Sequence, residues 1–258
     1  MALLEIKELT HFFGGLRAVY DFRISLKGGE LLGLIGPNGA GKTTIFNLVS
    51  GFYRPTEGEI RFQGKDIIGL RPHAVTSQGM ARTFQNIRLW NSLTVFDNLC
   101  IAQHYHLGYG LLAAILRNRR YRENERRVRK TAEELLEILG LGHYAMEYPK
   151  NLPYGLQRRV EIGRALSVQP KLLLLDEPAA GMNPGEVEQL IDLVQWIRDR
   201  FNLTIWLIEH HMRVVMSVRE WIKVVDFGET IAEGTPAAIR QNPRVIQAYL
   251  GDEEPDYA

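Results

Sequence analysis

Residues 36–43 combine glycines, a lysine and a threonine in an order that suits the binding of a polyphosphate. The segment reads Gly36-Pro37-Asn38-Gly39-Ala40-Gly41-Lys42-Thr43 and fits the pattern G-x-x-x-x-G-K-[ST] at every fixed position. It follows the apolar residues 31–35, for which we expect a short buried strand, and precedes residues 44–49, for which we expect a helix. Strand, glycine-rich turn and helix is the context in which this pattern binds phosphate. The sequence therefore predicts a nucleoside triphosphate site.

The residue types of this segment each have a chemical task. Glycines let the backbone come close to the ligand, so that several N–H groups can point at one polyphosphate. The helix that opens at Thr44 adds the positive end of its dipole, and Lys42 adds a full charge beside the β- and γ-phosphates. The hydroxyl of Thr43 is then placed to bind Mg²⁺. The alternative, a glycine-rich turn with a surface lysine, explains the pattern less well.

A second segment places two carboxylates directly after an apolar run. Residues 172–175 are four leucines, and Asp176 and Glu177 follow them. A buried strand would deliver both carboxylates to its carboxyl end, where open α/β sheets bind their ligands. Asp176 would then hold Mg²⁺, directly or through water, and Glu177 would activate the water that attacks the γ-phosphate. Alone, the run is equally compatible with a strand followed by a turn; the upstream phosphate-binding pattern favours the functional interpretation.

Composition predicts an α/β protein of a reducing compartment. Of 258 residues, 45% are hydrophobic, and 31 basic residues nearly balance 30 acidic ones, which gives no indication of a nucleic-acid partner. Cys100 is the only cysteine, so an internal disulfide is excluded. No apolar stretch approaches the length of a membrane span, and the first residues lack a signal-peptide pattern. We therefore expect other chains to cross any membrane at which this protein works.

The middle of the chain changes to helical character. Between about residues 93 and 139 the pattern predicts helices, and residues 117–130 are dense in arginine with glutamates interleaved. We expect a solvated helix with i,i+4 ion pairs there; a membrane-surface or partner-docking role is the alternative. Strand patterns return at residues 171–175, 203–208 and 221–225, alternating with helices as a mainly parallel sheet requires. The acidic residues after Gly251 predict a loose tail.

Residues 151–166 resemble a segment of a known family. They lie just before the Asp176-Glu177 strand and, with the flanking motifs, are similar to the ATP-binding subunits of ABC transporters. In that family a Leu-Ser-Gly-Gly-Gln motif opens a helix whose dipole faces the γ-phosphate held by the opposite subunit. The resemblance implies ATP and Mg²⁺ as ligands, ATP hydrolysis, and two ATP-binding domains that sandwich the nucleotide. The residues in the position of this signature motif, acting in trans, are Pro153, Tyr154, Gly155, Leu156 and Gln157.

The family also implies an architecture. It is an α/β fold with a P-loop NTPase core of ABC ATPase type, an antiparallel β subdomain and an inserted α-helical subdomain. Residues 1–251 would form one nucleotide-binding domain, with its core at about 1–84 and 168–235 and its helical subdomain at about 85–167. C-terminal helices would occupy about 236–251, followed by the acidic tail 252–258.

Single residues outside the main motifs acquire roles from the same resemblance. Phe13 matches the aromatic residue that stacks on adenine, although a core aromatic position is a serious alternative. Gln85 matches the glutamine that touches Mg²⁺ or the attacking water and senses the membrane partner. Asn183 lies in the loop that links the two ATP sites, where aspartate is more usual. His210 matches the switch histidine that reaches the γ-phosphate, and His211 stands where the family often has aspartate. The residues expected to contact ATP or Mg²⁺ directly are Phe13, Gly36, Pro37, Asn38, Gly39, Ala40, Gly41, Lys42, Thr43, Thr44, Gln85 and Asp176.

Further segments narrow the resemblance to the branched-chain amino acid uptake subfamily, and within it to the LivG type. They are residues 82–85, 94–99, 102–104, 153–155, 158–159, 179–184, 225–234 and 245–251. This similarity implies a second, LivF-like ATPase subunit, two membrane permease subunits and, indirectly, a periplasmic or surface solute-binding protein. It implies no nucleic-acid partner. The subunit would lie in the cytoplasm, peripherally on the inner face of the cell membrane.

The signature segment departs from the family pattern. Pro153 replaces the serine hydroxyl, Tyr154 replaces a glycine, and Leu156 stands where a glutamine is expected. Proline suits the first turn of a helix, and we expect Asn151 to cap that helix. The helix dipole and the Gly155 N–H would then remain while side-chain donors are lost. We infer that this signature forms the weaker of two ATP sites.

The sequence leaves three alternative functions. The first is an ABC ATPase for another cargo, either urea or amide import or lipopolysaccharide export. The second is a soluble ABC protein of DNA repair or translation, which usually has two nucleotide domains or a long coiled-coil insert; neither pattern is present. The third is a kinase, suggested by Asp226-Phe227-Gly228, but the kinase glycine loop and catalytic loop are missing elsewhere.

Overall fold

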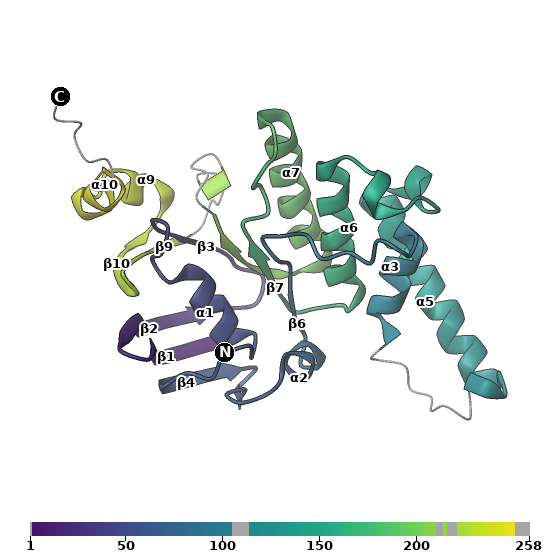
Figure 1. Ribbon diagram of the computed structural model, residues 1–258, viewed down its shortest axis with the longest axis horizontal. Helices are drawn as coiled ribbons and strands as arrows, with labels where there is room; N and C mark the ends of the chain where they lie inside the picture. Colours follow the sequence, from purple (N-terminus) through teal and green to yellow (C-terminus); the bar gives the residue numbers. More distant parts are fainter. Residues whose placement is uncertain (1, 105–113, 210–213, 216–220, 251–258) are drawn as a thin grey trace.

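The chain folds around two β-sheets, with one helix between them and the other helices outside (Figure 1). The computed structural model describes residues 2–104, 114–209, 214–215 and 221–250. The strands are β1 (Leu4–Phe13), β2 (Leu16–Leu26), β3 (Leu31–Ile35), β4 (Glu57–Phe62), β5 (Lys65–Asp66), β6 (Met80–Arg82), β7 (Leu172–Asp176), β8 (Thr204–Ile208), β9 (Trp221–Asp226) and β10 (Glu229–Gly234). The helices are α1 (Lys42–Val49), α2 (Pro72–Ser77), α3 (Val95–Ala102), α5 (Arg119–Ile138), η2 (Gly142–Tyr144), η3 (Pro149–Asn151), α6 (Tyr154–Ser167), α7 (Pro184–Phe201), α9 (Pro236–Arg240) and α10 (Pro243–Leu250).

The smaller sheet is antiparallel, in the order β2-β1-β4-β5. Its long hairpin pairs Leu4 with Leu26 and Phe13 with Leu16. Ile60 and Phe62 of β4 are buried and alternate with exposed residues, as expected for a sheet with one face on the core. This sheet therefore buries one face and exposes the other.

The larger sheet has the order β10-β9-β3-β8-β7-β6 and is parallel except for its edge strand β10. All five residues of β3, of β7 and of β8 are buried, which explains their continuous apolar sequences. Because β3, β8 and β7 are neighbours and parallel, the residues that follow them meet at one edge. That edge receives the glycine-rich segment after Ile35 and the carboxylate pair Asp176-Glu177.

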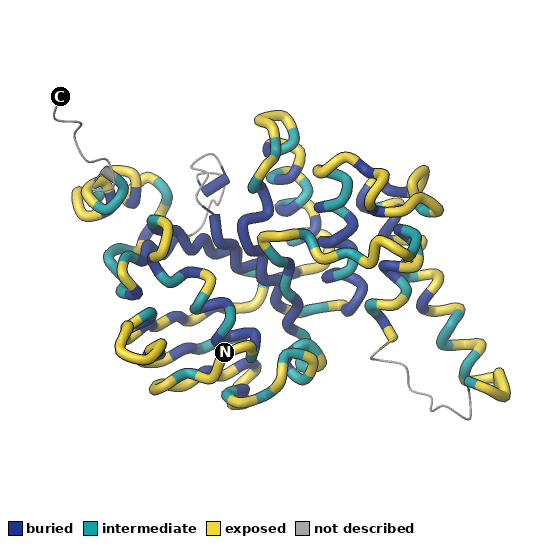
Figure 2. The backbone as a smooth tube through the Cα atoms, in the orientation of Figure 1, coloured by how far each residue is buried: buried dark blue, intermediate teal, exposed yellow. Residues whose placement is uncertain are grey.

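Two apolar cores lie on the two faces of the larger sheet. Between the sheets, Phe46 of α1 packs edge-on against Trp206, with 5.0 Å between ring centroids, and Phe22 of β2 stacks on Trp206 at 6.2 Å. The second core joins the opposite face to α6 and α7 and continues to α3 and α5. Figure 2 shows buried residues concentrated along the larger sheet. The sheet is thus covered on both faces, and the fold class predicted from the sequence is confirmed.

The arginine-rich segment forms α5, and its predicted ion pairs are present. Arg119 contacts Glu123 at 2.8 Å and Lys130 contacts Glu134 at 3.7 Å, each four residues apart. Val128 is buried on the other side of the helix, together with Ala132, Leu135 and Leu136. The helix is therefore solvated on one side, as predicted. Among the helices in the described part of the chain, none has the length and apolarity to cross a membrane.

Candidate functional site

The glycine-rich segment is a loop that only glycine can form at two of its positions. Gly41 has φ +94°, and a Cβ there would lie 2.5 Å from the carbonyl oxygen of Ala18. A Cβ on Gly36 would lie 2.0 Å from the carbonyl oxygen of Val225. Both glycines therefore allow close packing of the loop against neighbouring backbone. Gly39 also has a positive φ, +78°, but it faces open space, since nothing lies within 4 Å of its missing Cβ.

Helix α1 begins at Lys42 with a free N-terminus. No side chain caps it and no acidic residue lies in its first turn, so its positive end is available to an anion. Lys42 is only 5% exposed, and its Nζ donates to the carbonyl oxygens of Gly36 and Pro37, both at 2.7 Å. Burial lowers the pKa of Lys42, while Glu177 and Asp176 oppose that effect. Both of these hydrogen-bond acceptors are neutral carbonyl oxygens, whereas a phosphate bound in the loop would be an anionic acceptor for the ammonium group.

Asp176 closes β7 at the same edge and is 2% exposed. Its Oδ2 accepts from Nη2 of Arg82 at 2.7 Å, and Arg82 also donates to Oδ1 of Asn47 on α1 at 2.8 Å. The backbone N–H of Asp176 lies 3.4 Å from the Thr83 hydroxyl oxygen. Arg82 therefore joins α1, β6 and β7 beneath the loop, a role that the sequence analysis missed because nothing in the local pattern distinguishes this arginine.

Glu177 adopts an unusual backbone conformation directly after β7. Its φ is +44°, in the left-handed region, which costs a non-glycine residue about 1–3 kcal/mol. The backbone N–H of Glu177 donates to Ile208 at 3.0 Å, which anchors the turn to β8. Its carboxylate accepts from Nε2 of Gln85 at 2.8 Å. The structure thus brings together Gln85 and Glu177, which the sequence analysis assigned to the attacking water.

The oxygen atoms at this edge are of the kinds that Mg²⁺ prefers. Thr43 is exposed and contributes a hydroxyl, and Asp176 contributes a carboxylate. Gln85 contributes its amide oxygen, since its contact with Glu177 uses the amide nitrogen. The described residues contain no group of three or more His, Cys, Asp or Glu that could hold a metal ion alone. This arrangement fits Mg²⁺, which commonly uses one or two protein ligands together with substrate phosphates.

Phe13 is an exposed member of an aromatic cluster at the surface, in which His11 is buried and Tyr53 is exposed. Phe13 is 44% exposed and meets His11 edge-on, with 4.6 Å between ring centroids. Tyr53 lies edge-on to Phe13 at 5.3 Å and parallel to His11 at 5.9 Å. The ring of Phe13 is therefore supported from behind and available to a flat ligand. His11 and Tyr53 had not been singled out from the sequence.

Helix α6 carries the signature segment but begins differently from our expectation. Its N-cap residue is Pro153, without a side-chain cap, and Asn151 ends the preceding turn η3. The prediction that Asn151 caps this helix is wrong, because Leu152 and Pro153 are extended and separate it from the first turn. Gln157 donates to its own chain, at the carbonyl oxygen of Leu152, with a distance of 2.9 Å.

The remaining signature residues lie around this helix start. Tyr154 is 39% exposed, and Pro153 is also exposed. Leu156 is partly buried and packs against the core, whereas a Cβ on Gly155 would lie 3.0 Å from Oε1 of Glu186 on α7. The first turn of α6 therefore packs beside the start of α7.

Asn183 has a clear structural task at the start of α7. Its Oδ1 accepts from the backbone N–H of Glu186 at 3.0 Å, and the Glu186 carboxylate accepts from the N–H of Asn183 at 3.0 Å. This reciprocal capping box fixes the junction between the loop 180–183 and the first turn of α7. Aspartate, the residue more usual in the family, can cap in the same way.

His210 lies outside the described residues, as does the acidic tail 252–258. The residue before it, Glu209, is fully buried and accepts from the backbone N–H of Ala179 at 2.8 Å. This contact ties the end of β8 to the turn that follows Glu177. An acidic residue directly after an apolar strand was the available signal for Glu209, and it is the same signal that identified Asp176.

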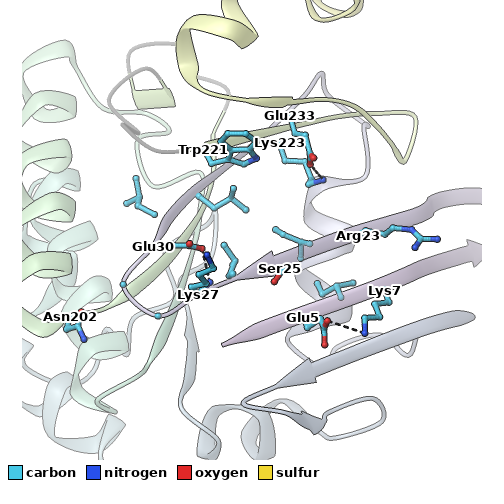
Figure 3. Close-up of a pocket in the computed structure, with 17 residues that line it drawn as sticks. Glu5, Lys7, Arg23, Ser25, Lys27, Glu30, Asn202, Trp221, Lys223 and Glu233 are labelled. Atoms are coloured by element: carbon cyan, nitrogen blue, oxygen red, sulfur yellow. Dashed lines mark hydrogen bonds and ion pairs between the residues drawn. The ribbon is translucent and has the colours of Figure 1, made fainter. Parts of the chain in front are cut away.

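A large hollow in the described structure lies elsewhere. Its volume is about 1070 Å³, and it opens at the amino end of β3, next to Leu31 and Leu32. Figure 3 shows two ion pairs among its lining residues: Lys7 contacts Glu5 at 3.1 Å, and Lys223 contacts Glu233. Ligands of open α/β sheets bind at the carboxyl ends of the strands, which is the opposite end. We therefore assign the chemistry to the glycine-rich edge and not to this hollow.

The fold and this edge define a P-loop NTPase. A glycine-rich loop connects β3 to α1. Strand β7, which is separated from β3 by β8, ends at the same edge with an aspartate and a glutamate. The family model described as ABC transporter matches residues 19–180, and that described as branched-chain amino acid ATP-binding cassette transporter matches residues 229–255. The chain belongs to the ATP-binding subunits of ABC transporters, a family of ATP-hydrolysing proteins.

Curated relatives and solved structures agree with this assignment. The chain is 45% identical over 250 residues to the high-affinity branched-chain amino acid transport ATP-binding protein BraF of Pseudomonas aeruginosa and to LivG of Escherichia coli K12. In both cases 97% of this chain and 98% of the relative are covered. A lipopolysaccharide export ATP-binding protein of Haemophilus influenzae is 33% identical, over 98% of this chain and 99% of the relative. The ADP conformation of an ATP-binding cassette of an ABC transporter superposes with a TM-score of 0.84, at 31% identity and over 97% of this chain and 99% of that one.

Proposed function

We propose that this chain is the ATP-hydrolysing subunit of an importer for branched-chain or related hydrophobic amino acids. One observation carries the chemistry: the free start of α1 with Lys42 and the Gln85–Glu177 pair lie at one edge of the sheet. The cargo is supported by the 45% identity to BraF and LivG over 97% of the chain, which exceeds the 33% identity to the lipopolysaccharide export protein.

Binding of ATP would use the whole edge. The backbone N–H groups of residues 38–44 and the ammonium group of Lys42 would surround the β- and γ-phosphates, Gly36 and Pro37 would line the same loop, and Phe13 would stack on adenine. Thr43, Asp176 and Gln85 would hold Mg²⁺, which neutralises charge on the phosphates. Lys42 would exchange its two carbonyl contacts for phosphate oxygens, a stronger charge-assisted interaction.

Hydrolysis would depend on the Glu177 carboxylate. It would accept a proton from the attacking water, which the Gln85 amide holds in line with the γ-phosphate. The left-handed turn at Glu177 directs this carboxylate to the loop edge, and its backbone bond to Ile208 keeps the turn in place. His210 would contact the γ-phosphate from the end of β8.

A second ATP-binding subunit would complete the site. The start of α6 has no side-chain cap and no acidic residue in its first turn, so its dipole can face a γ-phosphate held by another subunit. Here residues 153–157 offer few side-chain donors: proline has none, Leu156 is apolar and Gln157 is engaged within its own chain. We therefore infer a LivF-like partner with a more regular signature and a weaker ATP site at this chain's α6. Asn183 would lie at the contact between the two sites.

Permease subunits would dock on the helical side of the molecule. A hollow of about 430 Å³ beside the Gln85 loop is lined by Phe84, Arg88, Trp90, Glu161 and Arg164. Its aromatic and cationic groups pack together: the guanidinium carbons of Arg88 and Arg164 lie 4.2 Å and 4.1 Å from the ring centres of Phe84 and Trp90. We place the subunit peripherally on the inner face of the cell membrane, with a solute-binding protein acting on the far side. We divide the chain into a core at about 1–84 and 168–235, a helical subdomain at about 85–167 and C-terminal helices at about 236–251.

Purification of the complex from its native membrane tests this function. A tagged chain is expected to bring down two different permeases and a second ATPase, and the complex should hydrolyse ATP faster when leucine-loaded solute-binding protein is added. The same purification with Lys42→Ala separates assembly from ATP binding, because this variant should still recover the permeases. Recovery of lipopolysaccharide-export components, or of no membrane protein, would contradict the proposed cargo.

A further inference from the structure

Arg158 is a fully buried charge on α6 that lies outside the residues assigned to ATP. Its Nη1 donates to the carbonyl oxygen of Phe84 at 2.7 Å, and its Nη2 donates to that of Gln85 at 2.9 Å. Both oxygens belong to the loop that carries Gln85, the residue whose side chain contacts Glu177. Burying a guanidinium group is costly unless its donors are paired, and here both terminal nitrogens are paired while Nε has no hydrogen-bond partner among the described residues.

Glu161, one turn further along α6, completes the contact. Its Oε2 accepts from Arg158 at 2.5 Å, and its Oε1 accepts from the backbone N–H groups of Phe84 at 3.2 Å and Arg88 at 3.5 Å. Burial raises the pKa of Glu161, and Arg158 opposes that effect. The pair therefore holds both the N–H and the carbonyl side of the loop 84–88.

Tyr154 connects the same arginine to the start of the helix. Nη2 of Arg158 lies 3.1 Å from the tyrosine hydroxyl, which accepts the hydrogen bond. A Cβ on Gly181 would lie 3.7 Å from the tyrosine ring, so that ring also lies beside the loop that leads to Asn183. The tyrosine that stands in place of a signature glycine thus supplies a contact that glycine could not make.

We propose that Arg158, through Tyr154 and Glu161, is a positioning residue that makes the Gln85 loop and the start of α6 move as one unit. The inference rests on the proposed roles of Gln85 in this chain's ATP site and of α6 in the partner's site. Phe84, Arg88 and Glu161 also line the 430 Å³ hollow beside the loop. A permease segment that shifts this loop would therefore displace the signature turn together with Gln85, so that one docking event reaches both ATP sites.

The test compares ATP hydrolysis by the purified complex carrying substitutions in this chain. Arg158→Met should lower kcat on the order of 10²-fold, since a misplaced group outside the reacting centre can cost that much. KM for ATP should change less than about twofold, because the P-loop contacts persist. Tyr154→Phe removes only one hydroxyl and should lower kcat about fivefold, as expected for loss of one hydrogen bond. Arg158→Lys, with fewer donors, should fall between wild type and Arg158→Met.

Arg159→Met is the matched control on the same helix. Its guanidinium group contacts the carbonyl oxygen of Leu139 at 3.3 Å and Gln189 at 3.0 Å, and both partners lie away from the Gln85 loop. We expect kcat of Arg159→Met to stay within about twofold of wild type, as for substitutions outside the functional network. The double variant Tyr154→Phe/Arg158→Met should be no slower than Arg158→Met, since both changes break the same link.

The outcomes separate this inference from the proposed function. A folded Arg158→Met complex with unchanged kcat, or Tyr154→Phe and Arg158→Met effects that multiply, would overturn the positioning role. If Arg158→Met does not fold, an unchanged kcat in Tyr154→Phe overturns it equally. Gln85→Ala is measured in parallel: if that variant alone keeps full kcat, the assignment of the catalytic site itself is wrong.

Discussion

The side-chain amide of Gln85 donates a hydrogen bond to the carboxylate of Glu177, with 2.8 Å between Nε2 and Oε2. The two residues are 92 positions apart, one after β6 and the other after β7. Since β6 and β7 are adjacent parallel strands, both residues emerge at the same sheet edge. The proposed catalytic base thus contacts the loop that borders the proposed permease hollow, and a movement of this loop changes the surroundings of the base.

Lys42→Ala is expected to abolish tight ATP binding. A hydrogen bond to a charged group contributes about 1.5–3 kcal/mol, so affinity should fall by about one to two orders of magnitude or more. Fluorescent ATP titration of the purified chain measures this loss. Lys7→Ala, at an exposed lysine of the small sheet, is the control and should bind as wild type. Equal affinity of both variants would remove Lys42 from the phosphate site.

Arg82→Met is expected to destabilise the folded chain strongly. The Arg82–Asp176 pair is buried on both sides, with side chains 6% and 3% exposed, and removal of one partner leaves a buried charge that costs about 3–5 kcal/mol. Arg119→Met breaks an exposed pair and should cost less than about 1 kcal/mol. Urea unfolding of both variants gives the comparison, and similar losses would mean that the buried pair contributes no more than a surface one.

Asn183→Ala is expected to cost about 1 kcal/mol of folding free energy, since it removes the side-chain cap of α7. Asn183→Asp should be close to neutral, because aspartate caps a helix about as well as asparagine. Thermal and urea unfolding distinguish the two substitutions. Equal destabilisation by both would show that the capping box is not what Asn183 contributes.

Acidification is expected to destabilise the protein through His11. Burial lowers its pKa from 6.5, and both ring nitrogens lack a hydrogen-bond partner among the described residues. The unfolded chain therefore binds more protons at mildly acidic pH. Stability contributed by the neutral ring is present above pH 6.5 and is lost as the pH falls through 6.5 toward the lower folded pKa. Urea unfolding of wild type and His11→Phe between pH 8 and about 5.5 measures this, and parallel pH profiles would contradict it.

The sequence predicted the strand and helix that flank the proposed ATP site, because their signals are local. The end of β7 is marked by four leucines followed by Asp176. The end of β3 is marked by a glycine-rich loop between an apolar run and a helix. Parallel pairing of β3, β8 and β7 then brings these ends together. Alternation of strand and helix patterns predicted a mainly parallel sheet, whereas the order of its strands is known only from the structure.

Contacts between distant segments were not predictable in this way. Arg82 and Arg158 are ordinary arginines in the sequence, and only the fold shows that one reaches Asp176 and the other the Gln85 loop. The capping prediction for Asn151 failed because the extended residues 152–153 intervene before α6. Which polar residue caps a helix depends on the path of the chain into it, and side-chain type alone does not reveal that path.

ATP-driven leucine uptake with Glu177→Gln tests the proposed mechanism most directly. Complexes purified by a tag on this chain are reconstituted in proteoliposomes. ATP binding, ATP hydrolysis and leucine uptake are then measured on the same preparation. Glu177→Gln should bind ATP and remain in the ATP-bound dimer while hydrolysis and uptake fall about 10²–10⁴-fold, the usual contribution of a general base. Glu188→Gln, an exposed glutamate on α7, is the control and should behave as wild type. Rapid hydrolysis and uptake by the Glu177→Gln complex would contradict the role assigned to Glu177.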